Sequence, residues 1–293
     1  FPINLAMAEP DAEDLVEETP VPLEENDISS SLSLLAKTLD GTGVVFTKLD
    51  LPSKRIGDLT PVAAYQQVRY LDLSHNLISD MSPLGILDHI ISLNISHNKL
   101  KEFALPPLSY IQSIDVSYNS LTSFDSVECV HLRDINISFN AIETISGLEK
   151  NPQLQRLDVD NNKLTASTGL GLNTLKELAV HQNQLPDLSG FSDLLLVKLL
   201  DLSDNPLTNL AGLPTGGALR RVTMRRCNIS EDTQLEALAE VNLEQLDFTE
   251  NPLTEGLDRV KIIRMLPSLN QLNLAPVTDE ERAASREVPE EAP

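Results

Sequence analysis

The sequence has no tryptophan, few other aromatic residues and half as many basic residues as acidic ones. Aromatic side chains make up 4% of the 293 residues, and 22 lysines and arginines stand against 44 aspartates and glutamates. A chain with a formal net charge of −22 repels nucleic-acid phosphates and anionic lipids, so we expect neither nucleic acid nor membrane as a partner. No apolar run approaches the ~20 residues that cross a bilayer. The start, FPINLAMAEPDAED, also lacks the basic and apolar regions of a secretory signal.

Cysteine is scarce as well, with only Cys129 and Cys227 in the chain. So low a count is typical of a reducing compartment, which favours the cytoplasm. The repeat described below places these two residues about four coils apart. Because neighbouring strands lie ~4.8 Å apart, the two sulfurs are beyond disulfide reach, and we expect two free thiols.

Catalytic and cofactor-binding motifs are missing too. The sequence contains no GxxxxGK[ST], GxGxxG, HExxH, CxxC or GxSxG pattern. We therefore expect no enzymatic activity, no cofactor and no small-molecule substrate, and we expect the function to lie on surfaces that bind other proteins.

A repeated step of 21 to 24 residues is what the sequence does contain. The stretches LDLSHN and LNISHN end at Asn76 and Asn98, 22 positions apart, and both fit the template LxxLxLxxNxL. Ten consecutive steps fit it, and an eleventh, partial step begins at Leu269. The ninth template position is occupied by Lys54, Asn76, Asn98, Asn119, Asn140, Asn162, Asn183, Asn205, Cys227 and Asn251.

This register predicts an α/β fold, a right-handed leucine-rich-repeat solenoid curved like a horseshoe. Residues two apart, such as Leu71 and Leu73, share one face of a short strand, so stacked coils form a concave parallel sheet over a continuous core. Short helical turns complete the convex side, except that EDTQLEALAEVN from Glu231 predicts a true α-helix. The asparagines form a ladder that satisfies buried backbone groups where the chain turns.

Two ladder positions depart from asparagine. The thiol of Cys227 is small, easily buried and a weak donor, so we expect it to serve as a substitute. Lys54 cannot take the buried role, which marks the first coil as atypical, as terminal coils of such arrays are.

Both ends of the solenoid need caps. At the N-terminal end Asp27 is the expected N-cap of a helix with Ile28, Leu32, Leu35 and Leu39 on one face and Gly41 as its stop. At the C-terminal end we expect a helix from about Leu257 to Met265. Three regions follow from this interpretation: a disordered acidic tail over 1–27, the capped solenoid over 28–277, and a second acidic tail over 278–293.

Two clusters are candidate partner-binding sites. Four successive coils carry a ring at the eighth template position, so we expect an aromatic stripe on the concave side, formed by His75, His97, Tyr118 and Phe139. The alternative is that these rings stack on one another and close the turn. A zinc site at the two histidines would need two further ligands, which the sequence does not place.

The second cluster is a basic patch in the ninth coil, formed by Arg220, Arg221, Arg225 and Arg226. Four arginines in so acidic a chain can pair with the carboxylates of a partner or with the acidic tails of the chain itself. The alternative is a solvated face with no binding role.

Residues 28–60, ISSSLSLLAKTLDGTGVVFTKLDLPSKRIGDLT, and the later stretches VRYLDLSHNLISDMSPLGILDHIISLNISHNKL and LNTLKELAVHQNQL are more distinctive than the repeat itself. They resemble the axonemal leucine-rich repeat-containing protein twenty-three family, whose members are components of radial spokes in motile cilia and flagella. The resemblance spans residues 28–277, on repeats of the SDS22-like class. LSLLAKT and KLDLPSKRIGDLTPV are its least generic parts.

The resemblance implies a non-catalytic structural subunit of the radial spoke, part of a large axonemal complex, in the cytoskeleton of the cilium or flagellum. It implies other spoke subunits as partners. Two other functions remain open: a regulatory subunit of protein phosphatase 1, which would use the same concave face, and an axonemal dynein light chain, which would be a shorter solenoid with a helical end.

Overall fold

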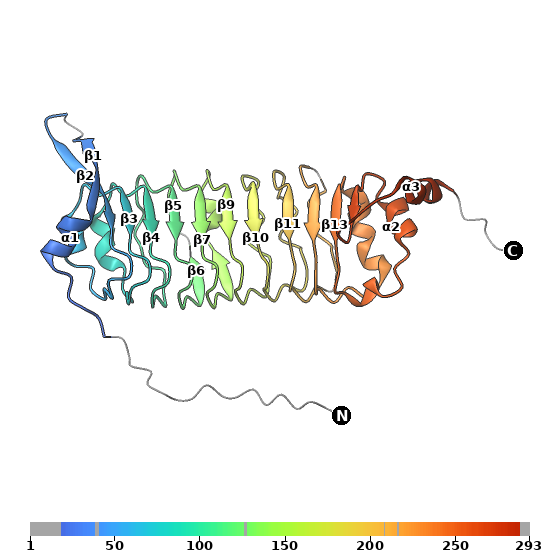
Figure 1. The fold of residues 1–293 in the computed structure, drawn as a ribbon, viewed down its shortest axis with the longest axis horizontal. Coiled ribbons are helices and arrows are strands. Elements are labelled where there is room, and N and C mark those ends of the chain that lie inside the picture. The colour runs from blue at the N-terminus through green and yellow to red at the C-terminus, as the bar shows by residue number, and fades with distance from the viewer. Residues whose placement is uncertain (1–18, 39–40, 126–127, 208, 216, 288–293) are drawn as a thin grey trace, which may run out of the picture.

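The protein is a row of stacked coils whose strands form one sheet along its whole length (Figure 1). The computed structural model describes residues 19–38, 41–125, 128–207, 209–215 and 217–287. The sheet has 13 strands, in the order β1-β2-β3-β4-β5-β7-β9-β10-β11-β12-β13-β14-β15. The strands from β3 to β13 in this sheet are β3 (Tyr70–Asp72), β4 (Ser92–Asn94), β5 (Ser113–Asp115), β7 (Asp134–Asn136), β9 (Arg156–Asp158), β10 (Glu177–Ala179), β11 (Leu199–Asp201), β12 (Arg221–Thr223) and β13 (Gln245–Asp247).

The core follows from the alternation along each strand. The middle residue of every strand points inward and is aligned with the middle residue of the next, as Leu71 is with Leu93 and Leu93 with Ile114. Each of these side chains is at most 3% exposed. One apolar cluster therefore runs through the described coils, and the parallel sheet and leucine-rich-repeat solenoid expected from the sequence are confirmed.

The asparagine ladder is confirmed in atomic detail. The Oδ1 atom of Asn98 accepts the N–H of Ile78 in the preceding coil at 3.0 Å. Its Nδ2 donates to the carbonyls of Leu73, Ile95 and Ser96, each at 3.0 Å. Each side-chain amide thus forms hydrogen bonds both within its own turn and to the preceding coil. The same pattern is made by Asn76, Asn119, Asn140, Asn162, Asn183, Asn205 and Asn251.

Cys227 substitutes for asparagine as the sequence predicted. Its Sγ donates to the carbonyls of Leu202 at 3.2 Å and Arg225 at 3.3 Å, and its N–H is accepted by Asn251. Burial raises the pKa of this thiol to about 11, so it stays protonated and can donate. Both Cys227 and Cys129 are free thiols, as expected.

The convex side is built from short segments. A second sheet pairs β6 (Ser123–Asp125) with β8 (Thr144–Ser146) in parallel, and five 3-10 turns lie elsewhere in the described residues. These turns are η1 (Val62–Ala64), η2 (Ser82–Ile86), η3 (Leu148–Lys150), η4 (Asp232–Glu240) and η5 (Pro252–Thr254).

The α-helix expected from Glu231 is wrong, because η4 is a 3-10 helix of nine residues. Leu235 and Leu238 of this helix and Val241, the residue directly after it, are buried and recur every three residues. That spacing matches the three residues per turn of a 3-10 helix and places all three side chains on the core.

The N-terminal cap also differs from the prediction. Helix α1 covers only Glu25–Ser31, and Glu24, rather than Asp27, is its N-cap. The chain then forms β1 (Leu32–Lys37), which pairs antiparallel with β2 (Val44–Asp50). A single long helix over these leucines would leave the edge of β2 unpaired, whereas the hairpin covers it. The two strands rise beyond the row of coils at its blue end (Figure 1).

The C-terminal cap contains more structure than the sequence indicated. Helix α2 (Arg259–Met265) confirms the expected helix, and Asp258 caps it. Strands β14 (Gln271–Leu272) and β15 (Ala275–Pro276) extend the sheet. The disordered tail expected over 278–293 is wrong for its first part, because α3 (Asp279–Arg286) packs on α2.

Three interactions explain why that acidic segment folds. Thr278 accepts the N–H of Glu281 as N-cap, and acidic residues in the first turn are favoured by the helix dipole. Glu281 also pairs with Arg259 of α2, with 2.7 Å between Oε1 and Nε. The disordered N-terminal tail expected over 1–27 is wrong for residues 25–27, which form the start of α1. Residues 1–18 of that tail lie outside the described residues, as do Leu39 in the expected capping helix and 288–293 in the expected C-terminal tail.

Candidate functional site: the concave face of the sheet

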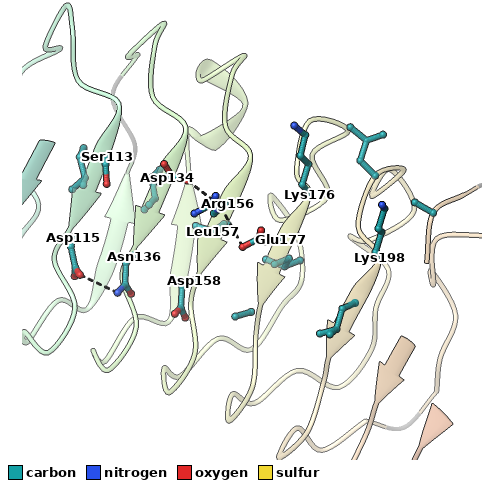
Figure 2. Close-up of a pocket in the computed structure, with 17 residues that line it drawn as sticks. Ser113, Asp115, Asp134, Asn136, Arg156, Leu157, Asp158, Lys176, Glu177 and Lys198 are labelled. Carbon is teal, nitrogen blue, oxygen red and sulfur yellow. Dashed lines mark hydrogen bonds and ion pairs between the residues drawn. The ribbon is translucent and has the colours of Figure 1, made fainter. Parts of the chain in front are cut away.

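An open groove of about 1160 Å³ crosses the middle of the concave face. It is lined by residues of β5, β7, β9, β10 and β11 and of the segments that precede them (Figure 2). Each of these strands is three residues long, and side chains alternate between the two faces of a strand. The first and third residues therefore face the groove, while the second is buried. The groove is therefore built from rows of side chains, each taken from one position of the repeat.

We call the first residues of the strands the central row. In the groove this row contains Asp134, Arg156 and Glu177, and Arg156 lies between the two carboxylates. Its Nε is 3.5 Å from Asp134 Oδ1 and 3.4 Å from Glu177 Oε2 (Figure 2). The next member, Leu199, is 47% exposed, and Leu196 beside the groove is 45% exposed. The central row thus offers a self-paired charge cluster and an apolar surface.

We call the residues immediately before the strands the basic row. In the groove it consists of Lys176 and Lys198, and Arg133 occupies the same repeat position before β7. Lys176 Nζ donates to the neutral amide of Gln155 at 2.9 Å. Both lysines lie along one side of the groove (Figure 2).

We call the third residues of the strands the acidic row. Asp115 and Asp158 line the opposite side of the groove, with Asn136 between them (Figure 2). Each accepts the backbone N–H two residues later, from Ser117 at 2.9 Å and from Asp160 at 3.0 Å. This bond explains why the repeat places Asp or Asn here: the short side chain closes the end of the strand.

Negative charge is crowded at the end of this row. Burial and then the charge of Asp158 raise the pKa of Asp160 to about 6. Burial, followed by the charge of Asp115, also raises the pKa of Asp158. The N–H of His181 donates to Asp160 at 2.6 Å, and its Nδ1 lies 3.5 Å from Asp204. Among the described residues, Asp158 and Asp160 therefore lie close to each other with no lysine or arginine within 4.0 Å, whereas Asp204 is paired with Arg226.

The four rings of the predicted aromatic stripe form one continuous stack. Ring centroids are 4.0 Å apart for His75 and His97, 4.0 Å for His97 and Tyr118, and 4.2 Å for Tyr118 and Phe139. The planes are within 13° of parallel. This is the alternative arrangement in which the rings close the turn. Tyr118 and Phe139 still expose 43% and 41% of their surface, so their outer edges face solvent.

The stack limits what the rings can bind. Ring faces are covered by neighbouring rings, so a cation cannot sit over a face inside the stack. Burial, with a further contribution from His75, lowers the pKa of His97, which therefore stays neutral at pH 7. Among the described residues no group of three or more His, Cys, Asp or Glu side chains is placed to hold a metal ion.

The predicted basic patch is divided by the structure. Arg226 donates to Asp204 and Glu250 at 2.6 and 2.8 Å, at the rim of the turn. Arg225 pairs with Asp247 on the concave face, and Arg220 lies 3.6 Å from Glu244. Because the sequence position of each arginine in the repeat sets its direction, four neighbours along the chain do not form one surface.

Arg221 is the exception among the four arginines. It starts β12 and lines a smaller groove of about 340 Å³ together with Arg225. In the described part of the chain it has no ion pair within 4.0 Å. The role of the four arginines and the four rings in binding a partner stays a prediction.

The sequence analysis missed the groove because its lining residues are scattered between Ser113 and Ala218. The repeat register contains the necessary signal. From β7 to β11 the second template position reads Arg133, Gln155, Lys176 and Lys198. From β5 to β11 the fifth position reads Asp115, Asn136, Asp158, Ala179 and Asp201. Clusters along the chain were the wrong signal for a solenoid, in which surfaces form across coils.

Comparison with known proteins supports the architecture. No family model and no curated protein matches the chain. An internalin from Listeria monocytogenes superposes with a TM-score of 0.55 and 18% identity, over 84% of this chain and 88% of the internalin. An internalin C2 from the same organism gives a TM-score of 0.55 and 24% identity, over 63% of this chain and 86% of that one.

At these identities the likeness shows the fold alone. The chain is a leucine-rich-repeat solenoid, an architecture that exposes one long, continuous face of its sheet. Among the described residues, no helix has the length and apolar character needed to cross a membrane.

Proposed function

We propose that this chain is a non-catalytic scaffold subunit of the radial spoke in motile cilia and flagella, where it holds neighbouring spoke proteins through its solenoid surface. The observation that carries the proposal is the entry segment, residues 28–60, whose sequence resembles the axonemal family. In the structure this segment forms the projecting hairpin of β1 and β2 and leads into the first coil. It is the part of the chain least explained by the repeat.

The surface chemistry is consistent with a scaffold. The hairpin exposes Leu35 and Phe46, which are paired across β1 and β2 and are 62% and 45% exposed. Exposed apolar side chains next to an open sheet edge are typical of contact sites. The concave groove adds a second surface with charged and apolar character. Two such surfaces allow one subunit to hold two neighbours.

Tagging the chain in a flagellated cell tests the proposal. We expect it in the axoneme, retained after a salt wash and chemically cross-linked to spoke subunits, and we expect it to be lost from axonemes that lack spokes. Co-extraction with dynein heavy chains would instead support a dynein light chain. Capture of the catalytic subunit of protein phosphatase 1, without axonemal retention, would support a phosphatase regulator. Either result contradicts the spoke assignment.

A further inference from the structure

The concave groove separates positive and negative charge onto its two sides. Lys176 and Lys198 line one side, Asp115 and Asp158 the other, and the central row between them pairs its own charges through Arg156. The two sides come from the second and fifth template positions. The two positions are three residue steps apart along the strand, which is about 10 Å at ~3.3 Å per residue.

Within the described residues, neither side is neutralised by an ion pair. Asp115 accepts hydrogen bonds from neutral groups, namely Ser117 and the amide of Asn136. In the part of the chain that the structure describes, neither Lys198 nor Asp158 has an ion pair within 4.0 Å. Elsewhere on the same sheet the chain does pair such groups: Asp247 at the equivalent position of β13 binds Arg225.

We propose that the groove binds an amphipathic helix of a partner protein, with acidic side chains along the flank that faces Lys176 and Lys198 and basic side chains along the flank that faces Asp115 and Asp158. An apolar stripe between the flanks covers Leu199, the member of the central row at the β11 end of the groove. This inference rests on the scaffold role proposed above and specifies the chemistry of the segment that one of its surfaces holds.

The dimensions of the groove suit a helix. Its width of about 10 Å is close to the 10–12 Å diameter of a helix with side chains. Its five strands span about 19 Å, which corresponds to about 13 helical residues at 1.5 Å each. An extended strand is narrower and would leave one charged side without a partner. Within the described chain the helices α1, α2 and α3 have seven, seven and eight residues, so a second copy offers no described α-helix of that length.

Charge on the two flanks also fixes the direction in which the helix lies. Turning a helix end for end about the groove exchanges its flanks. A helix with acid on one flank therefore fits in one direction only, and a helix with the flanks exchanged fits in the opposite direction. A groove that bound its helix through apolar contacts alone would bind the helix in either direction.

The experiment uses the full-length protein and two synthetic helical peptides of about 18 residues, long enough for the groove. Both have a leucine stripe, glutamates on one flank and lysines on the other, and the flanks are exchanged between them. Each carries a photo-crosslinker at its N-terminus and a fluorophore. A third peptide of the same composition has its charges scrambled. Binding is measured by anisotropy, and cross-linked residues are mapped by mass spectrometry.

We expect both ordered peptides to bind more tightly than the scrambled peptide and to cross-link at opposite ends of the groove, one near β5 and the other near β11. The double variant Lys176→Glu with Lys198→Glu should weaken both by about tenfold, as two exposed ion-pair contacts become repulsive. The control Lys99→Glu with Lys101→Glu changes the net charge equally outside the groove and should leave binding unchanged. Thermal melts verify that both variants fold.

Three results would overturn the inference: binding of neither ordered peptide, equal binding of the scrambled peptide, or cross-linking of both ordered peptides at the same end. None of these bears on whether the chain is in the axoneme. Conversely, the chain could be absent from spokes and still bind the two peptides in opposite directions. That result would contradict the proposed function but support the inference about the groove.

Discussion

The turn after each strand has the same backbone in both halves of the solenoid but is filled by different side chains. In the N-terminal half its exposed position holds His75, His97, Tyr118 and Phe139, which stack ring on ring. In the C-terminal half the same position holds Asp204, Arg226 and Glu250, which alternate in charge and form ion pairs. All seven have φ between 52° and 61°, the left-handed region.

The repeat therefore fixes the spacing between side chains at this position but does not fix their residue type. Left-handed backbone costs ~1–2 kcal/mol at a residue other than glycine, and it is retained because the N–H there is bonded to the next coil. His75 donates to Ser96 at 3.0 Å and Asp204 to Arg225 at 2.8 Å. Side chains then emerge at about the strand spacing, which suits both stacked rings and alternating charges.

The largest effect we expect comes from the ladder that both halves share. Asn119→Ala, beside the rings, removes the acceptor of the Leu100 N–H and three donated hydrogen bonds. Buried backbone groups lose their partners, at ~1–3 kcal/mol. Asn205→Ala in the charged half should cost about the same. Urea unfolding measures both. A variant that unfolds like the parent would show that its amide is not needed.

The next largest effect distinguishes the halves. Tyr118→Ala removes two stacking contacts, with His97 and with Phe139. Aromatic pairs contribute ~0.5–1.5 kcal/mol each, and because Tyr118 is 43% exposed we expect the lower end for both pairs, a loss of about 1 kcal/mol. Since stacking between neutral rings is little screened, the loss should be the same at low and high salt. Tyr118→Phe keeps the ring and is the control. A loss that disappears in 1 M salt would contradict stacking as the cause.

The sequence predicts the parts of this molecule that repeat. Asn76 to Asn251 gave the register, and with it the strands, the core and the ladder. It is less informative at the ends, because a terminal strand is decided by what lies beside it. Leu32 and Leu35 fit a helical face equally well, but the unpaired edge of β2 makes them a strand.

Surfaces are predictable from the sequence only across the coils. The arginines of the ninth coil are neighbours along the chain, yet Arg225 and Arg226 point to different carboxylates. The rings were found because they were read as a column, at one template position. Whether they stack or bind was not decided by residue type, because both outcomes require the same spacing. Only the ring planes distinguish them.

A third prediction concerns Asp160, at the junction between the two halves. The pKa of about 6 in the folded state exceeds the ordinary value of 3.8, so the folded protein holds this proton more tightly than the unfolded chain. The charge therefore destabilises the fold above pH 6, and the penalty is lost as pH falls from 6 towards 4. Asp160→Asn should stabilise by about 1 kcal/mol at pH 8, after discounting for partial exposure.

Urea unfolding at pH 8, 6 and 4.5 measures this dependence, and the advantage of the variant should shrink at each step down. The amide oxygen of asparagine can still accept the His181 N–H, so the turn is kept. Asp158, His181 and Asp201 are the titratable neighbours whose charges act on this carboxyl. An advantage that stays constant with pH would show that packing, rather than charge, is responsible.

The smallest effect belongs to the charged half. Arg226→Gln removes the ion pairs with Asp204 and Glu250, whose contacts lie at the protein surface. The arginine holds the pKa of Asp204 below its usual value mainly through their hydrogen bonds, so the variant should lose stability above that pKa and lose less as pH falls through it. We expect a smaller loss than for Tyr118→Ala, present at low salt and absent in 1 M salt. Arg221→Gln is the matched control. If the Arg226 variant lost as much stability in 1 M salt, its side chain would act by packing over the turn, and the two halves would be alike.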